Sequence, residues 1–119
     1  MKQHITSEQL NEFLEYKIID GNANFNQERL SKINKALNID SNRSYPPFYL
    51  INVGLMIEML ENELQGLVNI ITFEGKYRII IVGLEDGEAY SVLKFELNTG
   101  KNNACDALWE VIKNIEGEW

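Results

Sequence analysis

The sequence predicts an α+β fold, in which a three-stranded antiparallel sheet over about residues 67–97 is packed by N-terminal helices and a C-terminal helix. Apolar residues recur every three or four positions before residue 65 and after residue 103, which is the period of an amphipathic helix. Between these parts, β-branched and aromatic residues gather in three short runs separated by turn residues. The sequence contains neither a repeat nor a low-complexity tract, so residues 1–119 are expected to form a single α+β domain.

The first helix is predicted over about Ser7–Ile18. Thr6 and Gln9 have the spacing of a capping box, in which two side chains satisfy backbone groups at the start of a helix. Apolar residues then follow at helical spacing, and Asp20-Gly21 is expected to end the helix.

Two further helices are predicted on either side of a proline-containing connector. One covers about Gln27–Asn38, with an asparagine shortly before it as the N-cap, and the other covers about Val53–Glu63 behind Asn52. Pro46-Pro47 cannot lie in a helix interior, because proline lacks a backbone N–H and its ring clashes with the preceding turn. The segment between the two helices is therefore expected to be a loop.

Three apolar runs after residue 66 predict an antiparallel meander: LVNIITFE, KYRIIIVGL and AYSVLKFEL. Asp86-Gly87 is a strong hairpin signal, because both residues tolerate positive φ. The middle run is apolar on both faces, as expected for a central strand. In the third run Leu93, Phe95 and Leu97 are expected to face one way. One sheet face should then meet helices, and the other should be covered only at its centre, by another element or by a second subunit.

The last helix is predicted over about Ala104–Ile115, with Asn102 or Asn103 as its N-cap. It holds Cys105, the only cysteine, close to its N-terminus, where the helix dipole can lower a thiol pKa. No Lys, Arg or His lies within three residues in the sequence, so a structural role for Cys105 is favoured over a reactive one. Trp109 lies beside the apolar stripe, which favours core packing and leaves this residue as a candidate interface anchor.

The net charge of −7 is unevenly distributed along the chain. Residues 1–50 carry six basic and six acidic side chains, whereas residues 51–119 carry five basic and twelve acidic ones. An acidic surface repels phosphates, so nucleic acid is not an expected direct partner. The charge favours a basic protein partner, and the alternative is that the excess carboxylates only keep the protein soluble.

Carboxylates are the remaining candidates for chemistry, because other catalytic and metal-binding residue types are scarce. With one histidine and one cysteine, the chain lacks the ligands for a tetrahedral zinc site and the residues for most nucleophile–base pairs. No glycine-rich phosphate loop is present in the sequence. No catalytic residue, metal site or cofactor is therefore assigned, and the protein is expected not to be an enzyme.

An acidic binding surface is predicted instead. Its members lie on one face of the third helix and at the tip of the second hairpin: Glu58, Glu61, Glu85, Asp86 and Glu88. Like charges around a tight turn cost stability, and a basic partner would relieve that cost. A simple solvated turn is the alternative, because hairpin tips are convex and wet, whereas a metal or acid–base site needs a partly dry cavity.

Four segments carry a family resemblance: ITSEQLNEFL, RLSKINKALNI, FYLINVGLMIEMLEN and NACDALWEVIKNI. In this order they resemble a family of small uncharacterised proteins encoded by phages and prophages of Gram-positive bacteria. The resemblance is best over GLMIEMLEN and CDALWEVIKNI, covers about half of the chain, and leaves out the middle sheet. Leu55 stands where the family pattern has a polar residue. The resemblance implies a mobile-element origin and intracellular action, and it brings no catalytic residues.

The leading hypothesis is a non-enzymatic phage or prophage-type protein that binds and inhibits a host macromolecule, for example a basic nucleic-acid-binding or defence protein. An immunity-like or antitoxin-like binding protein is the alternative, and a carboxylate- and metal-dependent enzyme is a third class. No apolar run reaches the roughly 18 residues that a membrane span needs, and no signal peptide is recognised. We therefore expect a protein of the bacterial host's cytoplasm without a membrane partner. The sequence is also compatible with a homodimer.

Overall fold

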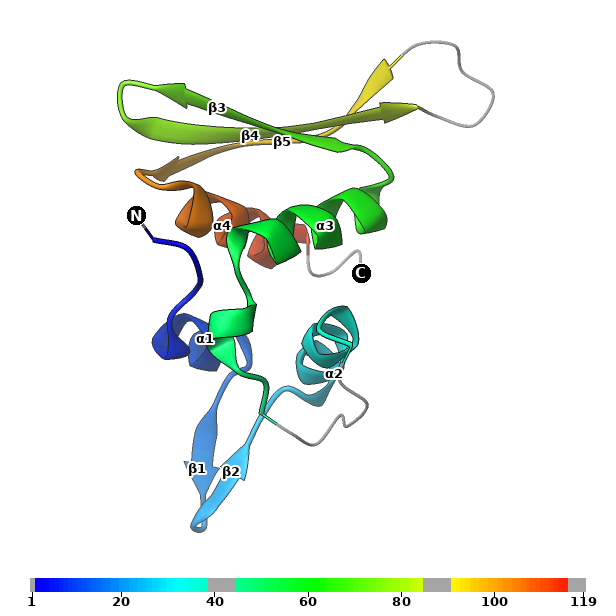
Figure 1. Cartoon of the computed structure of the whole chain (residues 1–119). Helices are drawn as coiled ribbons and strands as arrows, with labels where there is room; N and C mark the ends of the chain where they lie inside the picture. The colour runs from blue at the N-terminus through cyan, green and yellow to red at the C-terminus, as the bar shows by residue number, and fades with distance from the viewer. Residues whose placement is uncertain (1, 39–44, 85–90, 116–119) are drawn as a thin grey trace. The chain divides into compact units, whose positions relative to one another are not determined.

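The computed structural model describes residues 2–38, 45–84 and 91–115 (Figure 1). The chain divides into two compact units, which are His4–Asn52 on the one hand and Met1–Gln3 with Val53–Trp119 on the other. The chain therefore passes between the units twice, once after Gln3 and once after Asn52. The single domain expected over residues 1–119 stays a prediction.

The unit His4–Asn52 contains two helices, a short hairpin and a 3₁₀ turn: α1 (Ser7–Phe13), β1 (Lys17–Ile19), β2 (Asn22–Asn24), α2 (Gln27–Ala36) and η1 (Phe48–Leu50). Both helices begin at side-chain caps. The Thr6 hydroxyl accepts a hydrogen bond from Gln9 N at 3.1 Å, which completes the predicted capping box, and Asn26 Oδ1 accepts from Arg29 N at 3.1 Å. The caps explain why the predicted starts of both helices are correct.

The first helix is shorter than predicted. It ends at Phe13, and Lys17–Ile19 instead form strand β1, which pairs with β2 in an antiparallel hairpin. Asp20 and Gly21 have φ angles of 51° and 79°, so the two residues make the tight turn of that hairpin. The prediction of helix as far as Ile18 was wrong, because the Asp-Gly pair reverses the chain instead of merely ending a helix.

The other unit is a two-layer α+β arrangement: α3 (Val53–Leu64), β3 (Leu67–Phe73), β4 (Lys76–Leu84), β5 (Ser91–Lys101) and α4 (Ala104–Ile115). The three strands form an antiparallel sheet in the order β3-β4-β5, which confirms the predicted meander and the α+β class. Helices α3 and α4 pack against each other and against the same face of the sheet (Figure 1). Helices α1 and α2, which were also expected to pack on the sheet, belong to the other unit.

Residue pairing assigns each strand side chain to a face of the sheet. On the central strand Ile79 and Ile81 are fully buried, and they point to the face that α3 and α4 cover. We call this the inner sheet face. Ile81 pairs with Phe95, but the next residue of β4, Val82, pairs with Leu93, because β5 contains a bulge at this point.

The bulge corrects the predicted facing of β5. Phe95 and Leu97 lie on the inner sheet face as expected, whereas Leu93 is displaced to the opposite face and is exposed. Side chains of a strand normally alternate between the two faces of the sheet. One inserted residue in β5 interrupts this alternation, so the residues of β5 before the insertion lie on the face opposite to the expected one. A second irregularity lies at the other end of the same strand, where Tyr77 pairs with Lys101 while the adjacent Arg78 pairs with Asn98.

Candidate functional site

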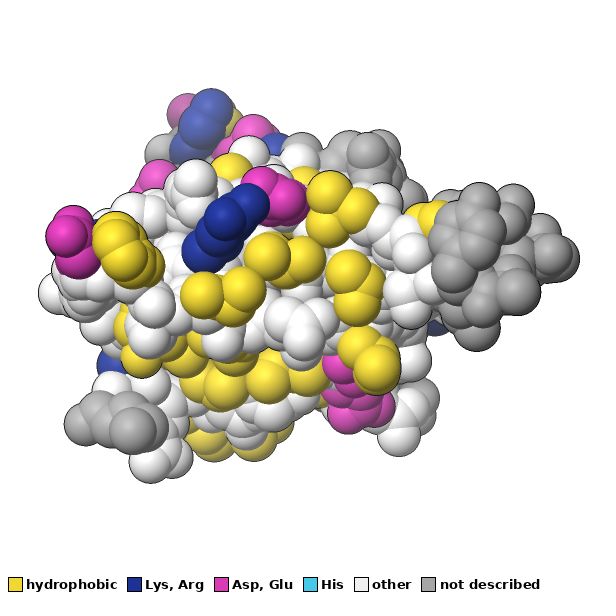
Figure 2. All heavy atoms as spheres, turned by 90° about the horizontal axis from the view of Figure 1, so that it is seen from above, with side chains coloured by type: hydrophobic (Ala, Val, Ile, Leu, Met, Phe, Trp, Pro, Cys, Tyr) yellow, Lys and Arg dark blue, Asp and Glu magenta, His cyan; other side chains and the backbone are white. Residues whose placement is uncertain are grey.

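The face of the sheet opposite α3 and α4 is largely apolar and exposed. We call it the outer sheet face, and its members follow from the pairing register: Leu67, Asn69, Ile71 and Phe73 of β3, Lys76, Arg78, Ile80 and Val82 of β4, and Leu93, Glu96 and Asn98 of β5. Phe73 is 75% exposed, Leu67 67%, Leu93 58% and Ile71 44%. Figure 2 looks onto this face and shows apolar side chains spread across it.

One ion pair lies within the outer sheet face. The Arg78 guanidinium donates to the Glu96 carboxylate across β4 and β5, and both side chains are partly exposed. Figure 2 shows a basic and an acidic side chain side by side among the apolar ones. Because Arg78 and Glu96 neutralise each other, the outer sheet face carries little of the net charge of the protein.

The two acidic residues predicted on the third helix behave differently from each other. Glu58 is exposed on α3, whereas Glu61 is half-buried and its Oε2 accepts a hydrogen bond from Val68 N at 2.9 Å. Glu61 therefore holds the start of β3 against the last turn of α3. Its carboxylate already accepts a hydrogen bond from a backbone N–H group. Of this pair, only Glu58 presents a carboxylate free of such a contact.

The other predicted acidic residues, Glu85, Asp86 and Glu88, lie outside the described residues. They belong to the segment that joins the end of β4 to the start of β5. Their proposed contribution to binding stays a prediction.

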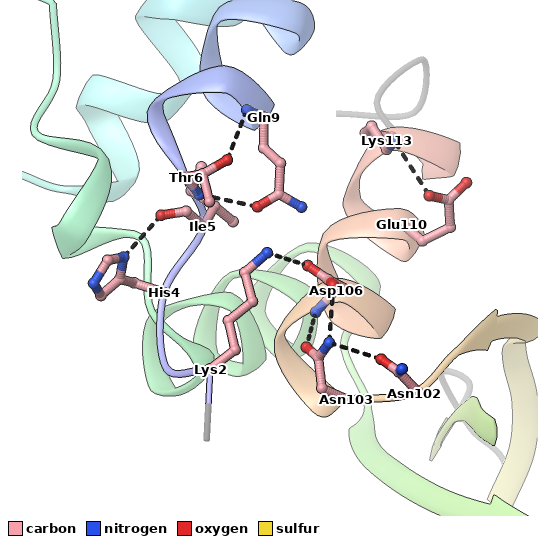
Figure 3. A network of polar contacts seen from close by, with 10 residues as sticks. All are labelled: Lys2, His4, Ile5, Thr6, Gln9, Asn102, Asn103, Asp106, Glu110 and Lys113. Atoms are coloured by element: carbon pink, nitrogen blue, oxygen red, sulfur yellow. Dashed lines mark hydrogen bonds and ion pairs between the residues drawn. The ribbon is translucent and has the colours of Figure 1, made fainter. Parts of the chain in front are cut away.

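The predicted N-cap of α4 is part of a polar network that also includes Lys2, which was not foreseen from the sequence (Figure 3). Asn103 Oδ1 accepts from Asp106 N at 2.8 Å and so caps the helix, while Asn103 Nδ2 donates to Asp106 Oδ2 at 2.8 Å. Lys2 Nζ then contacts Asp106 Oδ1 at 2.6 Å, across 104 positions in the chain. The network ties the first residues to α4, so its role is to hold the fold together.

The single histidine lies beside the 3₁₀ turn η1. His4 is exposed, its Nδ1 lies 2.8 Å from the carbonyl oxygen of Ile5, and its ring packs 5.8 Å from the ring of Phe48. His4 therefore packs its own segment against the 3₁₀ turn η1, where it also forms an isolated β-bridge with Asn52.

Cys105 is buried, and burial raises the pKa of its thiol to about 11. Desolvation is the largest cause of this shift in pKa, and the charges of Lys2 and Asp106 lower and raise the pKa respectively. The thiol is therefore protonated at neutral pH, which agrees with the structural role favoured from the sequence.

Trp109, the candidate interface anchor, is only 2% exposed. An anchor residue must be accessible before its partner binds, so the structure favours the packing interpretation of Trp109. The exposed apolar residues that sequence reasoning missed are those of the outer sheet face, Leu93 in particular. Leu93 was placed with Phe95 and Leu97, because the sequence interpretation assumed unbroken period-two alternation along β5.

Within residues 2–38, 45–84 and 91–115, no three His, Cys, Asp or Glu side chains come together as a metal-binding group. Nor is any helix in this part of the chain long and apolar enough to cross a membrane.

Comparisons with protein-family models, with curated proteins and with solved structures find no match to this chain. The resemblance to phage and prophage proteins therefore stays a prediction.

Proposed function

We propose that this protein acts without catalysis, by binding another protein through the outer sheet face. The observation that carries the proposal is the exposure of Leu67, Ile71, Phe73 and Leu93 on one side of a single sheet. An antiparallel sheet with one solvated face normally places polar residues there. Apolar patches that remain exposed in a folded chain are typical of interaction sites.

The charge of the chain favours a basic partner. Glu85, Asp86 and Glu88 follow β4 in the sequence, within the segment that joins β4 to β5. An apolar centre with a charged rim is the usual composition of a protein interface, and acidic rim residues accelerate association with a basic surface. Our first candidate is a host nucleic-acid-binding or defence protein, which a phage or prophage-type protein would inhibit inside the bacterial cell.

The experiment is a binding titration of a purified basic host nuclease or transcription factor, with the activity of that factor as a second readout. Leu93→Lys adds a charge to the outer sheet face and should weaken binding at least tenfold, because a lysine would be desolvated in the contact. Ile18→Lys is the matched control, since Ile18 is 59% exposed but lies on strand β1 in the other unit. It should leave binding unchanged.

Reversal of the acidic charges separates the two parts of the proposal. Glu85→Lys, Asp86→Lys and Glu88→Lys together should slow association and remove most of its salt dependence, while leaving apolar contacts in place. Equal binding by the wild type, Leu93→Lys and the charge-reversed variant would rule out the proposed binding surface.

A further inference from the structure

The two edges of the three-stranded sheet differ in how well they are protected from pairing. Edge strand β5 has two register irregularities and three charged residues, Lys94, Glu96 and Lys101, which are devices that keep other strands away. Edge strand β3 has the sequence LVNIITF, with seven residues in unbroken register and without charge, proline or glycine. All its residues except Val68 are exposed. One edge is therefore closed to a further strand, and the other is open.

The open edge offers backbone groups at defined positions. Val68 N donates to Glu61 rather than to β4, so Val68 is a residue whose backbone points away from the sheet. In an antiparallel strand this orientation alternates, so Ile70 and Thr72 also point their N–H and C=O groups outward. No described residue outside the sheet hydrogen-bonds to Ile70 or Thr72. The free stretch of the edge therefore runs from Asn69 to Phe73 and is centred on Ile71.

We propose that β3 pairs in antiparallel fashion with β3 of a second copy of this chain, about a twofold axis at Ile71, to form a continuous six-stranded sheet. In that register Ile70 of each copy and Thr72 of the other exchange both of their backbone hydrogen bonds. Val68 keeps its bond to Glu61. Side chains that face each other stay on the same face of the sheet, so Asn69 meets Phe73 on the outer face of the joined sheet.

A second copy fits this edge because β3 can pair with itself: the open positions Ile70 and Thr72 of one copy meet Thr72 and Ile70 of the other. Each copy has a net charge of −7, so two copies repel each other over most approaches. The uncharged strand β3 is where two acidic molecules can come together at the lowest electrostatic cost. Since each copy has one open edge and one protected edge, pairing stops at two copies and gives a closed dimer instead of a fibre.

Dimerisation through β3 would also enlarge the binding surface, and this part of the inference rests on the proposed function. Three strands about 4.8 Å apart, each of about seven residues at about 3.4 Å, give the outer sheet face a flat area of only about 340 Å². A standard protein interface buries about 800 Å² on each partner. Joining two outer faces edge to edge doubles the area and brings it close to that size.

The first test is sedimentation equilibrium of the full chain over a range of concentrations. The wild type should form a dimer and no larger species. Ile71→Lys places two lysines opposite each other at the twofold axis and should weaken the dimer at least tenfold. Leu93→Lys is the matched control, because it makes the same change on the same face at the protected edge. It should leave the dimer intact.

A second test fixes the register. Residues opposite each other in a pair without mutual hydrogen bonds have Cα atoms about 4.5 Å apart, which is within reach of a disulfide. Ile71→Cys should therefore become a disulfide-linked dimer under mild oxidation, whereas Leu93→Cys, which is more exposed, should not. The native thiol of Cys105 is buried and should not contribute.

Salt separates this inference from the proposed function. Added salt should strengthen the dimer by screening the repulsion between acidic copies, and it should weaken a complex with a basic partner. A wild-type chain that stays monomeric, an open-ended aggregate, or equal cross-linking of both cysteine variants would overturn the β3 dimer. If partner binding is still lost in Leu93→Lys under those outcomes, the proposed function survives without it.

Discussion

Both faces of the three-stranded sheet carry apolar residues, but the surroundings of the two faces are opposite. On the inner face Ile79 and Ile81 are completely buried beneath α3 and α4. On the outer face Leu67, Phe73 and Leu93 are more than half exposed. Apolar side chains on the covered face stabilise the fold, whereas those on the bare face are available to bind another molecule. The apolar pattern of a strand therefore does not tell by itself which of these two uses its residues have.

The largest expected effect tests the covered face directly. Ile81→Ala should lower the free energy of unfolding by about 2–5 kcal/mol, because it removes buried methyl groups and leaves a cavity. Ile71→Ala is the matched substitution on the outer sheet face and should cost about 1 kcal/mol or less. Urea unfolding of both variants measures the difference. Equal losses would mean that the two faces are equally covered in solution.

A close backbone approach at one end of the sheet predicts the next largest effect. A Cβ atom at Gly83 would overlap the carbonyl oxygen of Gln65 and lie 2.9 Å from Gly66 Cα, so the strand would have to shift away from the segment that joins α3 to β3. Gly83→Ala should cost about 1–3 kcal/mol. Gly75→Ala provides a comparison, because Gly75 has φ +77° but nothing within 4 Å of such a Cβ.

Gly75→Ala should cost only about 1 kcal/mol, from the left-handed backbone alone. Thermal unfolding of the two glycine variants would show whether contact or conformation dominates. A smaller loss for Gly83→Ala than for Gly75→Ala would contradict the close approach.

The cap of α4 tests how the covering helix begins. Asn103→Ala removes the side-chain acceptor for Asp106 N and should lower the free energy of unfolding by about 1 kcal/mol. Asn102→Ala, at the exposed neighbouring position, should have little effect. Chemical denaturation of both variants compares them, and identical stabilities would mean that Asn103 does not act as the cap.

Ionisation of the Cys105 thiol tests the burial of α4 through the dependence of stability on alkaline pH. The thiol pKa of about 11 lies above the ordinary value of 9.0, so burial favours the neutral form in the folded state. The stability that this provides is complete below pH 9 and is lost as the pH rises through 11, because the unfolded chain ionises first. Cys105→Ala should therefore show a weaker alkaline loss of stability than the wild type, as measured by urea unfolding at each pH.

Alkylation of the same thiol gives a kinetic measure. In the native protein Cys105 should react with iodoacetamide much more slowly than a free cysteine at neutral pH, and urea should remove the protection. Rapid alkylation of the native protein would show that α4 does not keep this residue from solvent.

The elements that carried local signals were predicted well. The bounds of α4 agree with the predicted Ala104–Ile115, and α2 starts at the predicted residue behind its asparagine cap. Strand β1 was missed, because Ile18 fits a helical stripe as well as a strand and the Asp20-Gly21 pair was taken as a helix end. An Asp-Gly pair was interpreted as a hairpin turn at residues 86–87 but as a helix end at residues 20–21. The hairpin β1–β2 could therefore have been predicted from the same dipeptide.

The candidate site could be predicted less well than the elements. Among its members Leu93 was assigned to the wrong face, because an inserted residue in β5 is decided by pairing with β4 and leaves no mark in the local pattern. Glu61 was predicted to be a binding residue, but the start of β3 lies close enough to use its carboxylate as a hydrogen-bond acceptor. Both findings depend on contacts between segments that are apart in the chain.

The sequence by itself determined the order of the four helices and of the three strands of the meander, and it determined the acidic character of residues 51–119. These features depend on composition and on interactions over a few residues. The tertiary structure decided which face of the sheet α3 and α4 cover, where the register of β5 is interrupted, and that the edge of β3 is open. Covering a face buries apolar area between distant segments, and the pattern within one strand cannot specify that choice when both of its faces are apolar.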